Sequence, residues 1–316
     1  MAAKSYPGTT IKVIGIGGAG GNAVDRMFQC KIKGIELVAV NTDAQDLKKI
    51  RAHRKVHIGK VSAGGLGAGM NPDVGKKAAE ESLGEITEVL KDADMVFLAA
   101  GMGGGTGGGA APVIAKLAKS QDILTIAVVT KPFSFEGGFR SRLASRALQE
   151  LEEHVDTLLI IPNDQVLKLV NEETTVLDAF WKADEVLRQA VQGISDLIVV
   201  PGLINVDFAD VRSIMKNAGQ AIFGMGVAKG EKRVETAFDT ALHSPLLDMS
   251  VKGAKGILFN VAGPQDLGLG EIMDAARKVQ ESVAPQAKII FGAVYDPSLK
   301  SGEVRVTVIA TGFSSS

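Results

Sequence analysis

The first half of the chain alternates short apolar runs with longer segments in which apolar residues recur every three or four positions. The short runs are rich in β-branched residues and predict strands at 11–17, 35–41, 94–101, 123–130 and 157–163. The segments between them, such as NAVDRMFQC and APVIAKLAKS, are typical of helices. Nearly continuous apolar strands that alternate with helices indicate a parallel sheet covered on both faces. We therefore predict an α/β domain, in which ligands bind beyond the carboxyl ends of the strands.

The second half of the chain has a different pattern. A long helix is predicted over 174–200, and at 1.5 Å per residue it spans roughly 40 Å. Beyond it, helices are predicted over 208–222 and near 270–283, and strands over 256–263, 288–296 and 303–311. This mixture predicts a smaller α+β domain. We expect a parallel-sheet domain at 1–173, a connecting helix at 174–200 and the α+β domain at 201–316.

Composition narrows the function classes. Of 316 residues, 46% are hydrophobic and 22% charged, and the net charge of −1 gives no reason to expect nucleic acid or an anionic membrane as a partner. The single cysteine, Cys30, cannot form an intramolecular disulfide, and no window reaches the ~20 apolar residues of a membrane span. We expect a soluble cytoplasmic protein. The four histidines show no ligand spacing, so we predict no metal site built from protein side chains alone.

The most unusual stretch is AAGMGGGTGGGAAP at 99–112, with seven glycines among the nine residues from Gly101 to Gly109. It follows a predicted strand and precedes a helix in which Pro112 is expected in the first turn. Two further glycine-rich loops, GIGGAGGN (15–22) and GGLGAGMNP (64–72), occur in the same half. Backbone N–H groups of such loops and of helix N-termini bind phosphate oxygens, so the three loops predict a single phosphate-bearing ligand.

The earlier loop also allows another interpretation. Gly15-x-Gly17-x-x-Gly20 fits the dinucleotide fingerprint, so an NAD(P)-dependent oxidoreductase is an alternative, testable by a change in nicotinamide absorbance. Against it, the second strand ends in AVNTDA rather than in a lone acid placed for a ribose hydroxyl. The chain has no GxxxxGK[ST] sequence at these loops, which excludes the P-loop architecture.

Several motifs together point to a known family. GGGTGGG (103–109) resembles the GGGTG[ST]G signature of the tubulin/FtsZ superfamily. The chain is also similar to the FtsZ family of bacterial cell-division GTPases, from about Ile11 to Phe313, in the segments NTDAQ (41–45), GLGAG (65–69), KPFSFEG (131–137), PND (162–164), ADEVLRQAVQGISDLI (183–198) and NVDFADV (205–211). The resemblance implies a tubulin/FtsZ-like fold and a self-assembling cytoskeletal GTPase. Such a protein polymerises head-to-tail into filaments and hydrolyses GTP to GDP and phosphate between subunits.

The resemblance also implies site residues. It assigns GTP or GDP as the ligand, with Mg²⁺ held mainly by the nucleotide phosphates. Phosphate contacts are expected from Gly17, Gly18, Gly104, Gly105, Thr106 and Gly107, with Ala68 and Gly69 beside the terminal phosphate. The first loop adds Ala19, Gly20 and Gly21, and the NTDAQ segment adds Asp43. Ribose contacts are expected from Glu136 and Arg140, and base contacts from Asn22, Asn163, Asp184 and Phe180. A carboxylate accepts from both N1–H and N2–H₂ of guanine, which would select GTP over ATP.

Spacing alone leaves these residues open to structural interpretations. Phe180 could simply be a core residue, and Arg140 could lie on a solvated helix face. Asp184 could form an (i, i+4) pair with Arg188 on the same helix. The acids Asp207 and Asp210 fit an N-cap with a first-turn acid.

The resemblance gives Asp207 and Asp210, with Asn205, a catalytic role. If Asp184 touches the base, the far end of the long helix lies about 24 Å away, so these acids cannot reach their own subunit's phosphates. The resemblance implies that they orient the attacking water on a neighbouring subunit's nucleotide. Such a contact is heterologous and generates a filament.

Two positions depart from the family pattern. Gly108 stands where Thr or Ser is usual, and we expect it to remove a hydrogen bond near the phosphates; Gly65 stands where many relatives have Arg. The chain ends in ATGFSSS, without the tail that docks membrane adaptors in this family. Division regulators, adaptors and a mid-cell location are implied by the resemblance, but these residues give no support for adaptor or direct membrane binding.

A tubulin-like filament for plasmid or phage DNA segregation is an alternative function, although no basic tail is visible. A nucleotide-binding structural protein that does not hydrolyse its ligand is a further alternative. The presence of Asp207 and Asp210 argues against it.

Overall fold

The computed structural model describes residues 8–168, 174–200, 202–246, 251, 253–296 and 299–313. It divides into two compact units, Met1–Val191 (unit 1) and Gln192–Ser316 (unit 2), and the division falls inside helix α8 (Val176–Val199). Helix α8 is the long helix expected from the sequence, and it is continuous. The three terminal serines, on which the expectation of a missing tail depends, lie outside the described residues. The three-part division at 173 and 200 stays a prediction.

Unit 1 contains a parallel sheet with strand order β3-β2-β1-β4-β5-β6. The prediction of a parallel α/β domain is confirmed, and each of the five predicted strands is present. The strand that the pattern missed is β3, whose residues RKVH are mostly polar. The strands are β1 (Ile11–Ile16), β2 (Ile35–Asn41), β3 (Arg54–His57), β4 (Met95–Gly101), β5 (Leu124–Lys131) and β6 (Thr157–Pro162).

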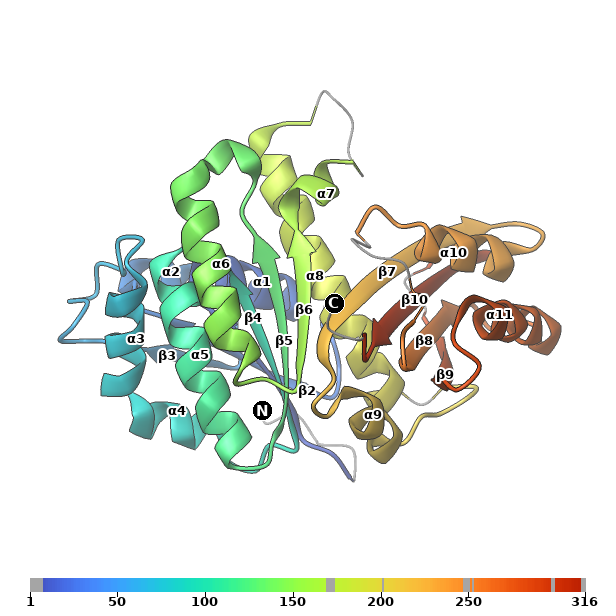
Figure 1. Cartoon of the computed structure of the whole chain (residues 1–316), viewed down its shortest axis with the longest axis horizontal. Helices are drawn as coiled ribbons and strands as arrows, with labels where there is room; N and C mark the ends of the chain where they lie inside the picture. Colours follow the sequence, from blue (N-terminus) through green and yellow to red (C-terminus); the bar gives the residue numbers. More distant parts are fainter. Residues whose placement is uncertain are drawn as a thin grey trace. The chain divides into compact units, whose positions relative to one another are not determined.

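Helices cover both faces of this sheet (Figure 1). On one face, a buried core joins strand residues such as Ile14 and Leu98 to Ile114 of α5 and Leu151 of α6. On the other face α1 lies so close to β1 that a Cβ on Gly15 would be 2.2 Å from the carbonyl oxygen of Gly20. The helices of unit 1 are α1 (Gly17–Gln29), α2 (Ala44–Lys49), α3 (Pro72–Glu81), α4 (Leu83–Leu90), α5 (Gly105–Ser120), the 3₁₀ helix η1 (Ser134–Glu136), α6 (Gly138–Glu152) and α7 (Asn163–Leu167).

Helix α5 begins inside the glycine cluster, at Gly105. The prediction that Pro112 lies in the first turn of this helix is therefore wrong, because Pro112 is in the helix interior. The glycines in its first turns let α5 lie very close to α3. A Cβ on Gly109 would be only 2.0 Å from the carbonyl oxygen of Pro72 in α3. Part of the glycine cluster is thus required for helix packing rather than for a loop.

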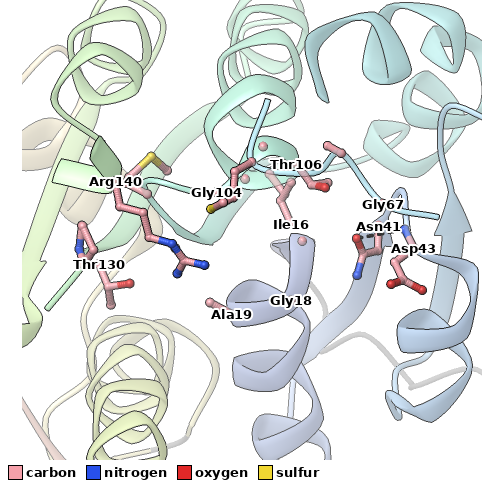
Figure 2. A pocket seen from close by; sticks show the side chains of 18 of the residues that line it. Ile16, Gly18, Ala19, Asn41, Asp43, Gly67, Gly104, Thr106, Thr130 and Arg140 are labelled. Carbon is pink, nitrogen blue, oxygen red and sulfur yellow. Dashed lines mark hydrogen bonds between the residues drawn. The ribbon is translucent and has the colours of Figure 1, made fainter. Parts of the chain in front are cut away.

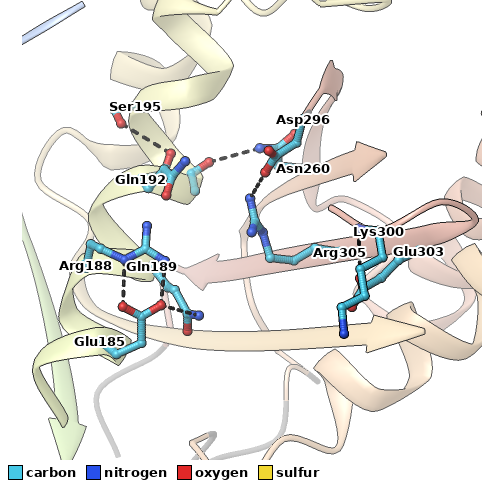
Figure 3. Close-up of polar contacts among 11 residues, drawn as sticks. Glu185, Arg188, Gln189, Gln192, Ser195, Asn260, Asp296, Lys300, Glu303 and Arg305 are labelled. Atoms are coloured by element: carbon cyan, nitrogen blue, oxygen red, sulfur yellow. Dashed lines mark hydrogen bonds and ion pairs between the residues drawn. The ribbon is translucent and has the colours of Figure 1, made fainter. Parts of the chain in front are cut away.

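Unit 2 has strand order β7-β10-β8-β9, with β10 antiparallel to β7 and β8, and β8 parallel to β9. This confirms a mixed α+β pattern in the second half. Its core contains Phe238, Phe259 and Val306, and an ion pair joins Arg305 to Asp296 at 2.6 Å (Figure 3). The elements are α9 (Phe208–Met215), β7 (Gly219–Lys229), α10 (Arg233–Leu242), β8 (Gly256–Gly263), α11 (Leu269–Ser282), β9 (Lys288–Tyr295) and β10 (Glu303–Thr311).

The helix predicted over 208–222 is wrong in its second half. It ends at Met215, and β7 starts at Gly219. Asn217 and Gly219 both have positive φ, at 52° and 69°, and this left-handed backbone cannot continue an α-helix. Within the described residues, no helix is both long and apolar enough to cross a membrane.

Candidate functional site

A cavity of about 510 Å³ opens at the carboxyl ends of the strands of unit 1 (Figure 2). All the predicted nucleotide-binding residues line it except Gly20, Gly21 and Asn22. Its lining residues come from segments as far apart as Gly17 and Asp184, and all belong to unit 1. It is also lined by residues that sequence reasoning did not select: Ile16, Asn41, Asp46, Leu66, Gly67, Met70, Gly101, Met102, Thr130, Pro132 and Ala183.

The three exceptions lie on helix α1. A Cβ on Gly20 would be 2.1 Å from the carbonyl oxygen of Ala99, and one on Gly21 would be 3.4 Å from Ile50 Cγ1, so these glycines accommodate neighbouring chain segments. Asn22 lines a different hollow of about 420 Å³, which we call the side hollow. Its remaining lining residues are Asp25, Arg26, Gln29, Cys30, Trp181 and Glu185.

Two helix N-termini meet at the cavity. The first turns of α1 (from Gly17) and α5 (from Gly105) both contribute lining residues. The first backbone N–H groups of a helix have no partner inside the helix, and the helix dipole adds positive potential there. Gly104, just before α5, has open space where a Cβ would stand. This end of the cavity is suited to an anion such as a phosphate chain.

A buried hydrogen bond links two of the segments around the cavity. Thr42 Oγ1 and Thr106 Oγ1 are 2.6 Å apart, and Thr42 is fully buried. The contact fixes the position of the Thr106 hydroxyl, which lines the cavity at the start of α5. Thr42 was not among the predicted site residues, although it lies within the NTDAQ segment.

Two carboxylates face the cavity from the start of α2. Asp43 Oδ1 accepts hydrogen bonds from the backbone N–H groups of Gln45 and Asp46, at 2.8 and 3.0 Å. Asp46 Oδ2 accepts from Asn41 Nδ2 at 2.9 Å. The described residues include no group of three or more acidic, histidine or cysteine side chains that could hold a metal ion. The two oxygen donors of Asp43 and Asp46 fit a hard cation such as Mg²⁺ only if other oxygens, such as those of phosphates, complete its coordination.

The other end of the cavity is lined by side chains from η1, α6, α7 and α8. Glu136 and Arg140 form an ion pair there, and Arg140 extends into the cavity from α6 (Figure 2). Asn163 is buried, and its Oδ1 has no hydrogen-bond partner among the described residues. Phe180 packs edge-on against Phe133 at 5.0 Å between ring centroids. This end therefore offers an apolar ring and an unsatisfied acceptor to a ligand.

Asp184 is a buried carboxylate at this end. Burial raises the pKa of Asp184 to about 6, although Arg26 opposes the shift from a distance of 3.5 Å between Nη2 and Oδ2. The sequence-based alternative, a pair between Asp184 and Arg188, is not what forms: Arg188 binds Glu185, with Nε 2.8 Å from Oε2 (Figure 3). Asp184 is instead paired with a cation from another helix, α1.

The predicted catalytic residues Asn205, Asp207 and Asp210 are all exposed in unit 2. Asp207 is the N-cap residue of α9, but its side chain makes no capping hydrogen bond. Asp210 lies in the first turn of the same helix. Asn205 Oδ1 accepts from the backbone N–H of Gly202 at 2.8 Å, which fixes the turn that precedes α9. Asp207 and Asp210 thus occupy the N-cap and first-turn positions that a purely structural interpretation expects. The Asp207 carboxylate, however, does not cap the helix.

The structure corrects the expectation for Gly108. Gly108 is buried in α5 and does not line the cavity; a Cβ there would lie 3.3 Å from Ala147 Cβ of α6. A side chain at 108 would start toward α6, so its absence does not remove a cavity hydrogen bond. Gly65 has a φ of +77°, a conformation that side chains rarely adopt.

Comparisons with known proteins identify relatives of this chain. The family model described as "Tubulin/FtsZ family, GTPase domain" matches residues 10–171, and that of the "FtsZ family, C-terminal domain" matches residues 219–314. The cell division protein FtsZ of Magnetospirillum gryphiswaldense is 51% identical over 306 residues, which are 96% of this chain and 54% of that protein. The chain therefore spans about half the length of this curated relative.

Solved structures are also similar. An empty FtsZ dimer from M. jannaschii has a TM-score of 0.94 and 46% identity, and the match covers 96% of this chain and 88% of that one. CetZ2 from Haloferax volcanii, in a GTPγS-bound protofilament, has a TM-score of 0.80 with 24% identity over 98% of this chain and 94% of that one, and so shares the fold.

Proposed function

This chain belongs to the tubulin/FtsZ family, and from that membership we propose that it is a GTPase of cell division that assembles head-to-tail into cytoskeletal filaments. The observation that carries the proposal is the cavity of unit 1, which joins two helix N-termini to an end that contains a buried carboxylate. A triphosphate suits the first end and a guanine base suits the second. Self-association finds support in the FtsZ dimer and the CetZ2 protofilament.

The phosphates are proposed to bind the backbone amides of Gly17, Gly18 and residues 104–107, with Ala68 and Gly69 beside the terminal phosphate. Asp43 and Asp46 would lie close enough to the phosphates to share a Mg²⁺ ion with their oxygens. When bound, Mg²⁺ offsets the charge of the triphosphate. Thr42 holds the Thr106 hydroxyl in place for this end of the nucleotide.

The ribose and base are proposed to bind at the end that contains Asn163 and Asp184. Glu136 and Arg140 offer charged partners for the ribose hydroxyls, and Phe180 offers a ring face to the base. Asn163 and Asp184 supply acceptors for the guanine donors, which satisfies the unpartnered Oδ1 of Asn163. Asn22, outside the cavity, has no proposed contact unless the base reaches the side hollow.

The raised pKa of Asp184 predicts a pH dependence of nucleotide binding. The carboxylate accepts from guanine, whereas the protonated acid loses this double acceptor, so GDP affinity should be constant above pH about 7 and fall as the pH drops through about 6. The loss should approach tenfold per pH unit well below that value. Calorimetric titration of GDP against pH measures it. An affinity that is flat down to pH about 4.5 would contradict a base contact by Asp184.

Hydrolysis is proposed to require assembly, because the acids of α9 act on the nucleotide of a neighbouring subunit. The contact joins different surfaces of two copies, so it extends into a filament. Asp207 and Asp210 would orient the attacking water, and Asn205 would support their turn. We also propose a cytoplasmic location at mid-cell and interaction with division regulators, as in the cell-division family that the chain belongs to.

This assembly dependence is directly testable. Phosphate release per molecule should be close to zero below a threshold protein concentration and rise steeply above it, in parallel with light scattering. GTP should support both signals and ATP neither, because adenine lacks the paired donors that Asp184 accepts. A rate per molecule that does not change with protein concentration would contradict hydrolysis between subunits.

A further inference from the structure

Arg26 lies beside the side hollow and contacts a residue that lines the nucleotide cavity. It lies on α1, lines the side hollow together with Trp181 and Glu185, and is ion-paired with Asp184, which lines the cavity. It does not itself line the cavity, so none of the roles proposed above includes it. Its side chain is largely buried, with 18% exposure, and that of Asp184 has 11%.

The guanidinium group of Arg26 lies between a carboxylate and an indole. Its Cζ is 4.6 Å from the centroid of the Trp181 ring, which is the geometry of a cation–π interaction. Its Nη2 is 3.5 Å from Asp184 Oδ2, a long distance for an ion pair. Its Nε is buried and has no hydrogen-bond partner among the described residues. The indole contact therefore adds to a long ion pair in holding this cation in place.

The other charged groups on this side are engaged elsewhere. Asp25 of the side hollow pairs with Arg51 at 2.9 Å, and Glu185 pairs with Arg188. Arg26 is thus the cation that pairs with the buried Asp184. It stabilises the ionised form of this carboxylate, which burial disfavours.

We propose that Arg26, held against Trp181, is a positioning residue that keeps Asp184 ionised and directed at the base, and thereby sets the pH range over which guanine nucleotides bind. The proposal rests on the proposed function, since it assumes that Asp184 contacts guanine. It extends that function by assigning a role to two residues outside the cavity. Trp181 contributes a flat π face, which a guanidinium fits better than a compact ammonium.

The test is the pH profile of GDP affinity in the full chain, measured by calorimetry from pH about 5 to about 8.5. For Arg26→Gln, removal of the cation should move the midpoint up by about one pH unit. This lowers affinity roughly fivefold at pH about 6 but less than about twofold at pH about 8.5. Trp181→Leu should move the midpoint in the same direction by less, because the cation remains but is less well held.

Two further variants separate charge from packing. Arg26→Lys retains the positive charge and should return the midpoint to within about half a pH unit of the wild-type value. Lys33→Gln removes a cation from the neighbouring surface, where it lines another hollow, and should leave the profile unchanged. Trp181 is the single tryptophan of the chain, so its fluorescence reports the surroundings of Arg26 in the wild type and should change when GDP binds.

The outcomes are distinguishable. A loss of affinity in Arg26→Gln that is equal at every pH would mean that Arg26 only supports the fold, and this would overturn the inference. An unshifted profile in Arg26→Gln would overturn it as well. If the wild-type chain fails to bind GDP at pH about 7.5, the proposed function itself fails, before any variant is compared.

Discussion

Replacing Asp210 by alanine is expected to lower GTP turnover at least about 100-fold while changing GDP affinity less than about twofold. Asp210 is exposed on α9 of unit 2, and the nucleotide cavity is lined by residues of unit 1 alone. Its removal therefore leaves the binding residues intact and takes away the group that we propose positions water on a neighbour's γ-phosphate. Phosphate release above the assembly threshold, with GDP titration of the same sample, measures both quantities.

Two controls make this result specific. Asp274→Ala removes an exposed acid of the same unit, on α11, and should leave turnover unchanged. Asp184→Ala should bind guanine nucleotides poorly, so by itself it should also be inactive. Mixing the two variants should restore part of the activity. The intact Asp210 of the Asp184→Ala subunits would then complete the nucleotide site of the Asp210→Ala subunits. Normal turnover in Asp210→Ala alone would remove this residue from the mechanism.

Gly109→Ala is expected to destabilise the fold by about 3 kcal/mol or more. A Cβ at this position would lie 2.0 Å from the carbonyl oxygen of Pro72 and 2.6 Å from the backbone nitrogen of Lys76. Both atoms belong to the backbone of α3 and cannot turn away as a flexible side chain could. Alanine gains about 1 kcal/mol in helix propensity over glycine, which is too little to offset the collision. Chemical denaturation measures the change in the free energy of unfolding.

Gly104→Ala is the matched control from the same glycine run. A Cβ at Gly104 would meet nothing within 4 Å, and its backbone is extended, with φ −94° and ψ 169°. The free energy of unfolding should therefore change by less than about 0.5 kcal/mol. Because Gly104 lines the cavity, GDP affinity should fall instead. Equal stability of the two variants would contradict the assignment of Gly109 to packing and Gly104 to the ligand.

The pattern of apolar residues predicted the elements that are buried on both sides. Strands β1, β4 and β5 have nearly continuous buried residues, and such runs stand out in any sequence. Strand β3 did not stand out, because RKVH is short and mostly polar. Strand β7 was read partly as helix because the small residues of GQAIFGMGVAK suit either structure, and its pairing with β10 is a long-range contact that no local pattern encodes.

The site was predicted largely from motifs, and some of the lining residues that were not selected lie within or next to those motifs, while others reach the cavity only through tertiary contacts. Asp46 follows Asp43 by three residues, so a short helix starting at Asp43 would have predicted that both line one face. Thr130 and Met102 reach the cavity only because β4 and β5 end beside each other. Arg26 could not be found from spacing, because 158 residues separate it from Asp184. Gly108 is the opposite case: it lies within a motif, but it faces α6 rather than the cavity.

The close contact between α3 and α5 also has a mechanical consequence. Backbone lies against backbone, since a Cβ on Gly75 would be 2.2 Å from the carbonyl oxygen of Gly105, so neither helix can slide without a collision. We therefore expect the two helices to move together as one rigid body. In the segment before α3, by contrast, Gly64, Gly65, Gly67 and Gly69 have positive φ and no Cβ at these positions would meet a close neighbour, so these glycines are needed for conformation rather than for packing. The glycines of this region therefore serve two purposes: those of α3 and α5 hold two helices in backbone contact, and those before α3 shape a loop that lines the cavity at Leu66 and Ala68.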